Sequence, residues 1–259
     1  MIPNKRLGQH FLTSPEIITQ IINTINPKNG DHLVEIGPGL GALTTLITPL
    51  CQRLDVIEID RRMVSHLKKA ATKSLYIHLA DALKFDFTQL SSKPHKLRIF
   101  GNLPYNISTP LLFHCLKQAD LIQDMHFTLQ QEVVERLAAQ PDGHDYGRLS
   151  VMAQYRCHIE HLFNIGAEHF HPQPKVNSAV VRLIPHHTLT IKARDENLFR
   201  LVVKQAFSQR RKKLSNSLKA LMTPVEMQTI DIDSNQRAQN LSVADFVKLS
   251  NFLATKHLA

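Results

Sequence analysis

The first 184 residues alternate between short apolar runs and longer segments whose apolar positions recur every three or four residues. The short runs are typical of buried strands, and the longer segments are typical of helices that bury one side. This alternation favours a mostly parallel sheet covered by helices on both faces. The expected strands are 33–36, 54–59, 75–79, 97–100 and 125–129, and the expected helices are 15–25, 42–50, 61–71 and 110–119.

The pattern changes toward the end of the chain. Two further strand-like runs, 159–163 and 178–184, have no long helix between them and can close the sheet in the antiparallel direction. Beyond residues 185–194 the remaining segments are helical, at 196–208, 213–221, 224–229 and 243–253. We therefore expect an α/β domain over residues 1–186 and a small all-α domain over residues 187–259.

The charge of the chain is strongly positive and unevenly distributed. The formal net charge is +9, and residues 185–259 hold 12 Lys or Arg against 6 Asp or Glu. Such a surface suits a polyanion such as RNA, DNA or an anionic membrane. The alternative is a surface that serves only solubility.

Cysteine and histidine usage bear on the compartment and on metals. Cys51, Cys115 and Cys157 are scattered and form no CxxC pair, which favours a reducing cytoplasm. The first residues contain no apolar signal core, and no apolar run approaches about 18 residues, so we expect a cytoplasmic protein without a membrane partner. The fifteen histidines show no HExxH or Cys/His ligand spacing, and we expect no metal site.

A glycine turn follows the first expected strand of the sheet. Gly37, Gly39 and Gly41 fit G-x-G-x-G but not the dinucleotide spacing G-x-G-x-x-G, because Ala42 stands at the last position. Glycines here allow a sharp turn and a close approach of the backbone to a ligand. Taken alone, the turn is equally compatible with having no ligand.

Carboxylates at the ends of the next two strands strengthen the case for a ligand. Glu58 lies about twenty residues after Gly37, where an acidic residue can accept hydrogen bonds from ribose hydroxyls. Asp60 is the neighbouring candidate, and we favour Glu58. Asp81 follows the third strand and can accept from an adenine amine. These residues predict an adenosine-containing cofactor but leave NAD and S-adenosylmethionine open.

The segment Asn102-Leu103-Pro104-Tyr105, after the fourth strand, indicates the chemistry. An adenine amine is a poor nucleophile because its lone pair is delocalised, and Asn102 and the Pro104 carbonyl can accept hydrogen bonds from both of its protons. Tyr105 offers a face on which a base can stack. The segment favours methyl transfer to a planar nitrogen over hydride transfer. The alternative is a proline turn that caps the next helix.

Six segments carry a resemblance to a known family. They are LGQHFL (7–12), EIGPGLGALT (35–44), VIEID (56–60), NLPYNIS (102–108), FHPQPKVNSAVVRL (170–183) and QRRKKLSNSL (209–218). Together they resemble the ribosomal RNA adenine dimethyltransferases, most closely the bacterial small-subunit branch. The resemblance implies a Rossmann-like class I methyltransferase domain with a helical C-terminal domain. It also implies S-adenosylmethionine as the cofactor and dimethylation of two adjacent adenines in the 3′-terminal hairpin of 16S rRNA.

The resemblance also implies roles for individual residues. The family has Asn or His at the position of His10, and Phe170 matches an aromatic residue that sandwiches the target base opposite Tyr105. The implied catalytic residues are Asn102, Leu103, Pro104, Tyr105 and Phe170. The implied cofactor contacts are His10, Leu12, Gly37, Glu58, Asp81 and Asn102.

The densest basic run comprises Arg210, Arg211, Lys212 and Lys213. Four cations are usually a solvated helix face, but Leu214, Leu218 and Leu221 supply an adjacent apolar stripe that can dock the segment. Together with Lys5 and Arg6, the run predicts salt-sensitive RNA contacts directed at phosphates. We expect target choice to come from RNA shape, with an unstacked adenine placed in the pocket.

Three alternatives stay open. They are a large-subunit adenine methyltransferase of the antibiotic-resistance type, a non-catalytic RNA-binding assembly factor, and a nicotinamide oxidoreductase. LGQHFL and RRKKLSNSL favour the small-subunit branch, the intact Asn102, Pro104 and Tyr105 argue against a mere binder, and the glycine spacing argues against an oxidoreductase. The expected partner is 16S rRNA in the small subunit or its precursor during ribosome assembly, and we expect a monomer.

Overall fold

The computed structural model describes residues 3–4, 7–70, 72–90, 96–189 and 191–256. Contacts divide the chain into two compact units. The first unit runs up to Val134 and resumes over His158–His187, and the second takes Glu135–Cys157 and the chain from Thr188 onward. The sequence pattern places the start of the helical region within a few residues of Thr188, but it assigns 135–157 to the first domain.

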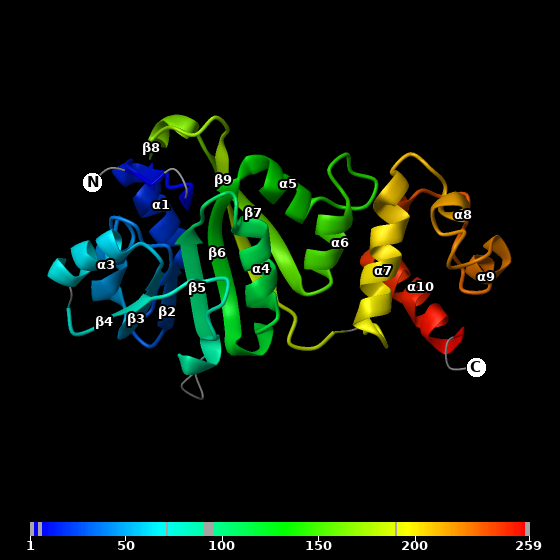
Figure 1. Cartoon of the computed structure of the whole chain (residues 1–259), viewed down its shortest axis with the longest axis horizontal. Coiled ribbons are helices and arrows are strands. Elements are labelled where there is room, and N and C mark those ends of the chain that lie inside the picture. The colour runs from blue at the N-terminus through cyan, green and yellow to red at the C-terminus, as the bar shows by residue number, and fades with distance from the viewer. Residues whose placement is uncertain (1–2, 5–6, 71, 91–95, 190, 257–259) are drawn as a thin grey trace. The chain divides into compact units, whose positions relative to one another are not determined.

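The first unit is built on a seven-stranded sheet (Figure 1). The strand order is β4-β3-β2-β5-β6-β9-β7. The first five strands in this order pair in parallel, and β9 pairs antiparallel with β6. This confirms the predicted α/β class with a mostly parallel sheet. The strands are β2 (His32–Ile36), β3 (Arg53–Glu58), β4 (Leu75–Leu79), β5 (Leu97–Asn102), β6 (Ile122–Gln130), β7 (Cys157–Ile165) and β9 (Ser178–Pro185).

The helices of the first unit follow the predicted pattern. In α1, Ser14 caps the N-terminus by accepting a hydrogen bond from the Ile17 N–H, Pro15 occupies the first turn, and four isoleucines are buried. β2 lies between β3 and β5, so successive strands are added on one side of β2 as far as β4 and then on its other side from β5 onward. Ligands bind in open α/β sheets at the carboxyl ends of the strands where the strand order switches in this way. The predicted helices correspond to α1 (Pro15–Ile25), α2 (Thr44–Ile47), α3 (Arg61–Leu67) and α4 (Ser108–Leu116). A further helix, α5 (Gln131–Ala138), was not predicted, and it begins in the first unit and ends in the second.

A second, two-stranded sheet was not predicted. β1 (Phe11–Leu12) pairs antiparallel with β8 (Phe170–His171), with Leu12 opposite Phe170. The Thr13 N–H donates a hydrogen bond to the His169 carbonyl at 2.9 Å, which extends the contact. Two-residue strands show no periodicity, so only the folded chain reveals that residues 11–13 lie against 169–171.

The second unit is helical and has its own core. Tyr146, Phe199 and Phe246 are fully buried there, and the Tyr146 hydroxyl donates a hydrogen bond to the Leu241 carbonyl. Residues 135–157 belong to this unit because Tyr146, Val151 and Tyr155 pack into its core. The helix expected over 213–221 is shorter, since the chain turns at Leu218. The helices are α6 (Arg148–Gln154), α7 (Glu196–Ala206), α8 (Leu214–Ser217), α9 (Pro224–Gln228) and α10 (Val243–Lys256).

One fully buried charge on the sheet of the first unit is held by three partners. Asp55 on β3 accepts hydrogen bonds from His32 at 2.7 Å, His78 at 2.6 Å and Arg53 at 2.7 Å. Burial by itself raises the pKa of the Asp55 carboxyl, but the hydrogen bonds from these three partners and the Arg53 charge outweigh it. The pKa of Asp55 therefore lies well below its usual range.

Candidate functional site

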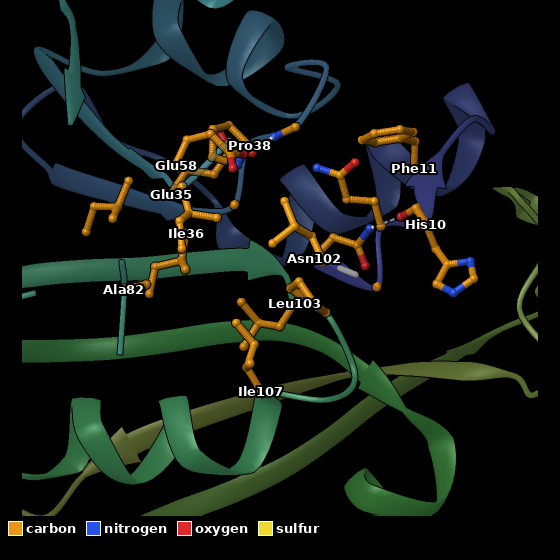
Figure 2. A pocket seen from close by; sticks show the side chains of 18 of the residues that line it. His10, Phe11, Glu35, Ile36, Pro38, Glu58, Ala82, Asn102, Leu103 and Ile107 are labelled. Carbon is orange, nitrogen blue, oxygen red and sulfur yellow. Dashed lines mark hydrogen bonds between the residues drawn. The ribbon is translucent and has the colours of Figure 1, made fainter. Parts of the chain in front are cut away.

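A cavity of about 310 Å³ lies at the carboxyl ends of the central strands of the first unit (Figure 2). Its walls come from segments that are far apart in the sequence, including the 7–13 segment, the glycine turn and the loop after β5. The size and concavity suit a small-molecule ligand. Nine of the predicted site residues line it: His10, Leu12, Gly37, Glu58, Asp81, Asn102, Leu103, Pro104 and Tyr105.

The glycine turn has a left-handed backbone conformation that glycine adopts readily and other residues rarely do. Gly37, Gly39 and Gly41 have φ values of 67°, 55° and 82°. A Cβ on Gly39 would lie 2.9 Å from the Phe11 ring, so the 7–13 segment packs directly onto the turn. A side chain at Gly39 would therefore disturb both the turn and the segment that covers it.

Glu58 ends β3 at the cavity wall and is 5% exposed. One carboxylate oxygen accepts a hydrogen bond from the Gly39 N–H at 3.1 Å, and the other accepts from the Asp60 N–H at 2.9 Å. Burial raises the pKa of Glu58, and these backbone hydrogen bonds oppose that rise. Each oxygen keeps a further lone pair that can accept from a ribose hydroxyl.

The structure separates Glu58 from its neighbouring candidate. Asp60 caps α3 by accepting from the Arg62 N–H at 3.0 Å, and it forms an ion pair with the Arg62 guanidinium at 2.6 Å. These contacts lower the pKa of Asp60. Asp81, after β4, lines the cavity and accepts a hydrogen bond from the Leu83 N–H at 3.0 Å. Glu58 and Asp81 thus line the cavity, while the Asp60 carboxylate is engaged by Arg62, and ligand contact by Glu58 stays a prediction.

Glu35 is a cavity residue that the sequence analysis did not select. It lies within β2, is 2% exposed, and accepts a hydrogen bond from the Thr44 hydroxyl at 2.6 Å. Burial, together with the nearby Glu58 charge, raises the pKa of Glu35 to about 8 in spite of that hydrogen bond. The sequence feature that could have identified Glu35 is a lone carboxylate within an apolar strand, just before the glycine turn. A cation bound beside Glu35 would favour its ionised form.

Asn102 is the last residue of β5, and its orientation is set by the 7–13 segment. The Asn102 side-chain nitrogen donates a hydrogen bond to the His10 carbonyl at 2.8 Å (Figure 2). The opposite amide orientation would place two oxygens against each other, so the nitrogen position follows from the contact. The amide oxygen receives no hydrogen bond from any residue that the structure describes, and it is available as an acceptor at the cavity.

The three residues after Asn102 are held in place by backbone and side-chain contacts. Leu103 is buried, and its N–H donates to the Thr128 carbonyl at 3.2 Å. The Pro104 carbonyl, the predicted second acceptor, already accepts from the Ile107 N–H at 3.1 Å and keeps one lone pair. The Tyr105 hydroxyl is 2.7 Å from the Ser178 hydroxyl.

Phe170 does not lie at the cavity. It is 4% exposed, lies on β8 opposite Leu12, and packs in the apolar core of the first unit. A contact of Phe170 with a target base stays a prediction.

The basic run 210–213 belongs to the second unit and is exposed. Arg210 donates a hydrogen bond to the His144 carbonyl, and Lys213 pairs through its backbone with Arg237. The side chain of Lys213 also donates to Asn235 at 3.0 Å. RNA contact by this run stays a prediction, and the predicted contacts of Lys5 and Arg6 lie outside the described residues.

Two further observations concern metals and membranes. Across the described ranges, no three His, Cys, Asp or Glu side chains are grouped so that they could hold a metal ion. Within the same part of the chain, no helix has both the length and the apolar character needed to cross a bilayer.

The fold and the cavity define the class of protein. A mostly parallel sheet with a glycine turn after β2, a cavity-lining carboxylate at the end of β3 and Asn-Leu-Pro-Tyr starting at the end of β5 is a class I methyltransferase arrangement. The family described as "Ribosomal RNA adenine dimethylase" matches residues 3–255. The chain belongs to this family.

Curated relatives are similar over almost the whole chain. The chain is 51% identical to the "Ribosomal RNA small subunit methyltransferase A" of Pseudomonas fluorescens (strain Pf0-1), with 96% of this chain and 93% of the relative covered. It is 50% identical to the protein of the same name from Marinobacter nauticus, with 96% and 91% covered.

Two solved structures share the fold over almost their full length. A dimethyladenosine transferase from Plasmodium falciparum superposes with a TM-score of 0.80 at 27% identity, covering 93% of this chain and 96% of that one. The 23S rRNA methyltransferase ErmE superposes with a TM-score of 0.73 at 21% identity, covering 94% and 99%. The second likeness bears on the fold alone.

Proposed function

We propose that this protein uses S-adenosylmethionine to dimethylate the N6 atoms of two adjacent adenines in the 3′-terminal hairpin of 16S rRNA during ribosome assembly. The observation that carries the proposal is the Asn102 amide, fixed by the His10 carbonyl at 2.8 Å with its oxygen free at the cavity. The names of the curated relatives support the small subunit as the source of the substrate.

The lining of the cavity fits the cofactor. Glu58 offers carboxylate lone pairs to ribose hydroxyls, and Asp81 offers an acceptor to the adenine amine. Ile57, Ile59 and Ala82 add apolar surface for the adenine ring. The buried Glu35 carboxyl can ionise against the positive charge of the methionine part. When bound, the cofactor supplies a methyl group activated on a sulfonium.

The remaining residues orient the target amine. The Asn102 oxygen and the free lone pair of the Pro104 carbonyl accept hydrogen bonds from its two N–H groups, which directs the nitrogen lone pair out of conjugation and toward the methyl group. Tyr105 stacks on the base, and the buried Leu103 keeps the loop in place. Alignment of this kind supplies roughly 7–11 kcal/mol of barrier reduction. The basic run 210–213 holds the RNA through its phosphates.

The test is to mix the protein with S-adenosylmethionine and unmethylated small subunits, and to measure N6,N6-dimethyladenosine by mass spectrometry. Asn102→Ala should slow methylation by at least about 100-fold, as loss of one preorganised polar contact does, while the RNA affinity stays within a few fold. The matched control is Asn23→Ala, which removes an exposed amide on α1 and should leave the rate unchanged.

Each alternative function has its own outcome in this assay. Full activity of Asn102→Ala would reject the role given to the amide. Product formed only on large subunits would indicate the antibiotic-resistance type of activity. Tight RNA binding without any product from the wild-type protein would indicate an assembly factor.

A further inference from the structure

His10 connects two parts of the proposed active site. Its carbonyl accepts the hydrogen bond from the Asn102 amide at 2.8 Å, and its ring stacks on the Tyr105 ring with centroids 5.6 Å apart and planes 24° apart. Its Nδ1 lies 2.6 Å from the Pro172 carbonyl. A carbonyl only accepts, so Nδ1 carries the proton in this contact.

Tyr105 is held at two points as a result. Its hydroxyl pairs with Ser178 at 2.7 Å at the start of β9, and one face of its ring lies against His10. A base that stacks on Tyr105 therefore uses the face that His10 leaves open. Pro172 and Ser178 both follow β8 in the chain, so the segment after β8 supports both rings.

We propose that the His10 ring is a positioning residue for the target base, a role separate from any contact with the cofactor. The ring fixes the plane of Tyr105, and the backbone of the same residue fixes the amide of Asn102. This inference rests on the proposed function, because the base in question is the adenine to be methylated.

The two contacts of His10 can be separated by substitution. The hydrogen bond to Asn102 comes from the backbone and survives any side-chain change, whereas the stack depends on the ring. His10→Ala and His10→Asn remove the aromatic face, and His10→Phe retains it while removing the donor to Pro172. The series therefore distinguishes the stack from the hydrogen bond.

In the methylation assay, the Ala and Asn variants should lower kcat about three- to tenfold, the range expected for loss of one aromatic pair. His10→Phe should restore kcat to within about twofold of the wild type, whatever the change in KM for S-adenosylmethionine. In a Tyr105→Ala background, His10→Ala should cause no further loss. A raised KM for S-adenosylmethionine with unchanged kcat would overturn the proposal in favour of a cofactor contact. The proposal would also be overturned if His10→Ala lowered kcat as much in the Tyr105→Ala background as it does in the wild-type background.

A second measurement needs no turnover. The chain has only four tyrosines and no tryptophan, so 3-fluorotyrosine labelling gives four fluorine NMR signals, and Tyr105→Phe identifies one of them. His10→Ala should shift the Tyr105 signal and leave those of the fully buried Tyr146 and the buried Tyr155 in place. An unmoved Tyr105 signal would overturn the proposal. If the wild-type protein lacked methylation activity, the proposed function would fail, while this spectrum would still decide the ring contact.

Discussion

Binding of S-adenosylmethionine near neutral pH should release almost one proton, and we expect Glu35 to be its source. Glu35 is 2% exposed, lines the cavity, and has a pKa raised to about 8 by burial and by the neighbouring Glu58 charge. The rise from 4.5 to about 8 means that ionising Glu35 in the folded protein costs about 5 kcal/mol more than in water. At pH 7 the carboxyl is therefore about 90% protonated.

A bound cation reverses this balance. S-adenosylmethionine carries positive charge on its sulfonium and ammonium groups, and an adjacent positive charge favours the carboxylate. If the bound cation brings the pKa of Glu35 back toward its usual range, most of one proton leaves at pH 7. The affinity then rises almost tenfold per pH unit between about pH 5 and pH 8. In the free protein, the effect of pH on folding stability runs in the opposite direction to its effect on cofactor affinity. The contribution of Glu35 to the free energy of unfolding is complete below about pH 4.3 and is lost as the pH rises through 8.

The assay is isothermal titration calorimetry at pH 7 in phosphate and in Tris, whose ionisation enthalpies differ. The dependence of the measured enthalpy on the buffer gives the number of protons released. Glu35→Gln should reduce that number strongly. Burial also raises the pKa of Glu58, so Glu58 can account for a smaller proton release that remains in this variant. Glu16→Gln, at an exposed position on α1, is the matched control and should release as many protons as the wild type. Equal release from the wild type and Glu35→Gln, or none from either, would refute this reasoning.

Three further predictions concern RNA contact and stability. Reversing the charges of residues 210–213 should weaken RNA binding and lower the slope of log affinity against log salt by about 3, and an unchanged slope would remove this run from the interface. Asp55→Asn should lower the free energy of unfolding at pH 7 by about 3 kcal/mol, measured by urea denaturation, since it disrupts a buried group with three partners. Because the folded-state pKa of Asp55 is depressed, that difference should shrink as the pH falls below about 4, and a difference independent of pH would contradict the assignment. Gly101→Ala should cost about 1–3 kcal/mol because its Cβ would lie 2.4 Å from the Ile36 carbonyl oxygen. Gly30→Ala, with no atom within 4 Å of its Cβ, should change stability little, and similar losses in both glycine variants would argue against this packing explanation.

Much of the first unit could be predicted because its strands and helices have local signatures. β4 begins and ends at the predicted residues, β2, β5, β6, β7 and β9 contain the predicted runs, and β3 ends at Glu58, one residue before the predicted end. Strands buried on both faces are mostly apolar, so their positions can be predicted from local composition. The carboxyl ends of parallel strands meet at one edge, and for this reason the strand pattern is sufficient to assign Glu58 and Asp81 to a common cavity.

What the sequence by itself determined was therefore the order of most of the elements, the class of fold and nine of the residues that line the cavity. The tertiary structure alone decided the pairing of β1 with β8, the inclusion of 135–157 in the helical unit, the burial of Phe170 and the contacts of His10 with Asn102 and Tyr105. It also decided the raised pKa of Glu35. The physical reason is that periodicity reports how each residue relates to its neighbours in the chain, whereas pairing partners, desolvation and side-chain orientation depend on residues that only folding brings within a few ångströms.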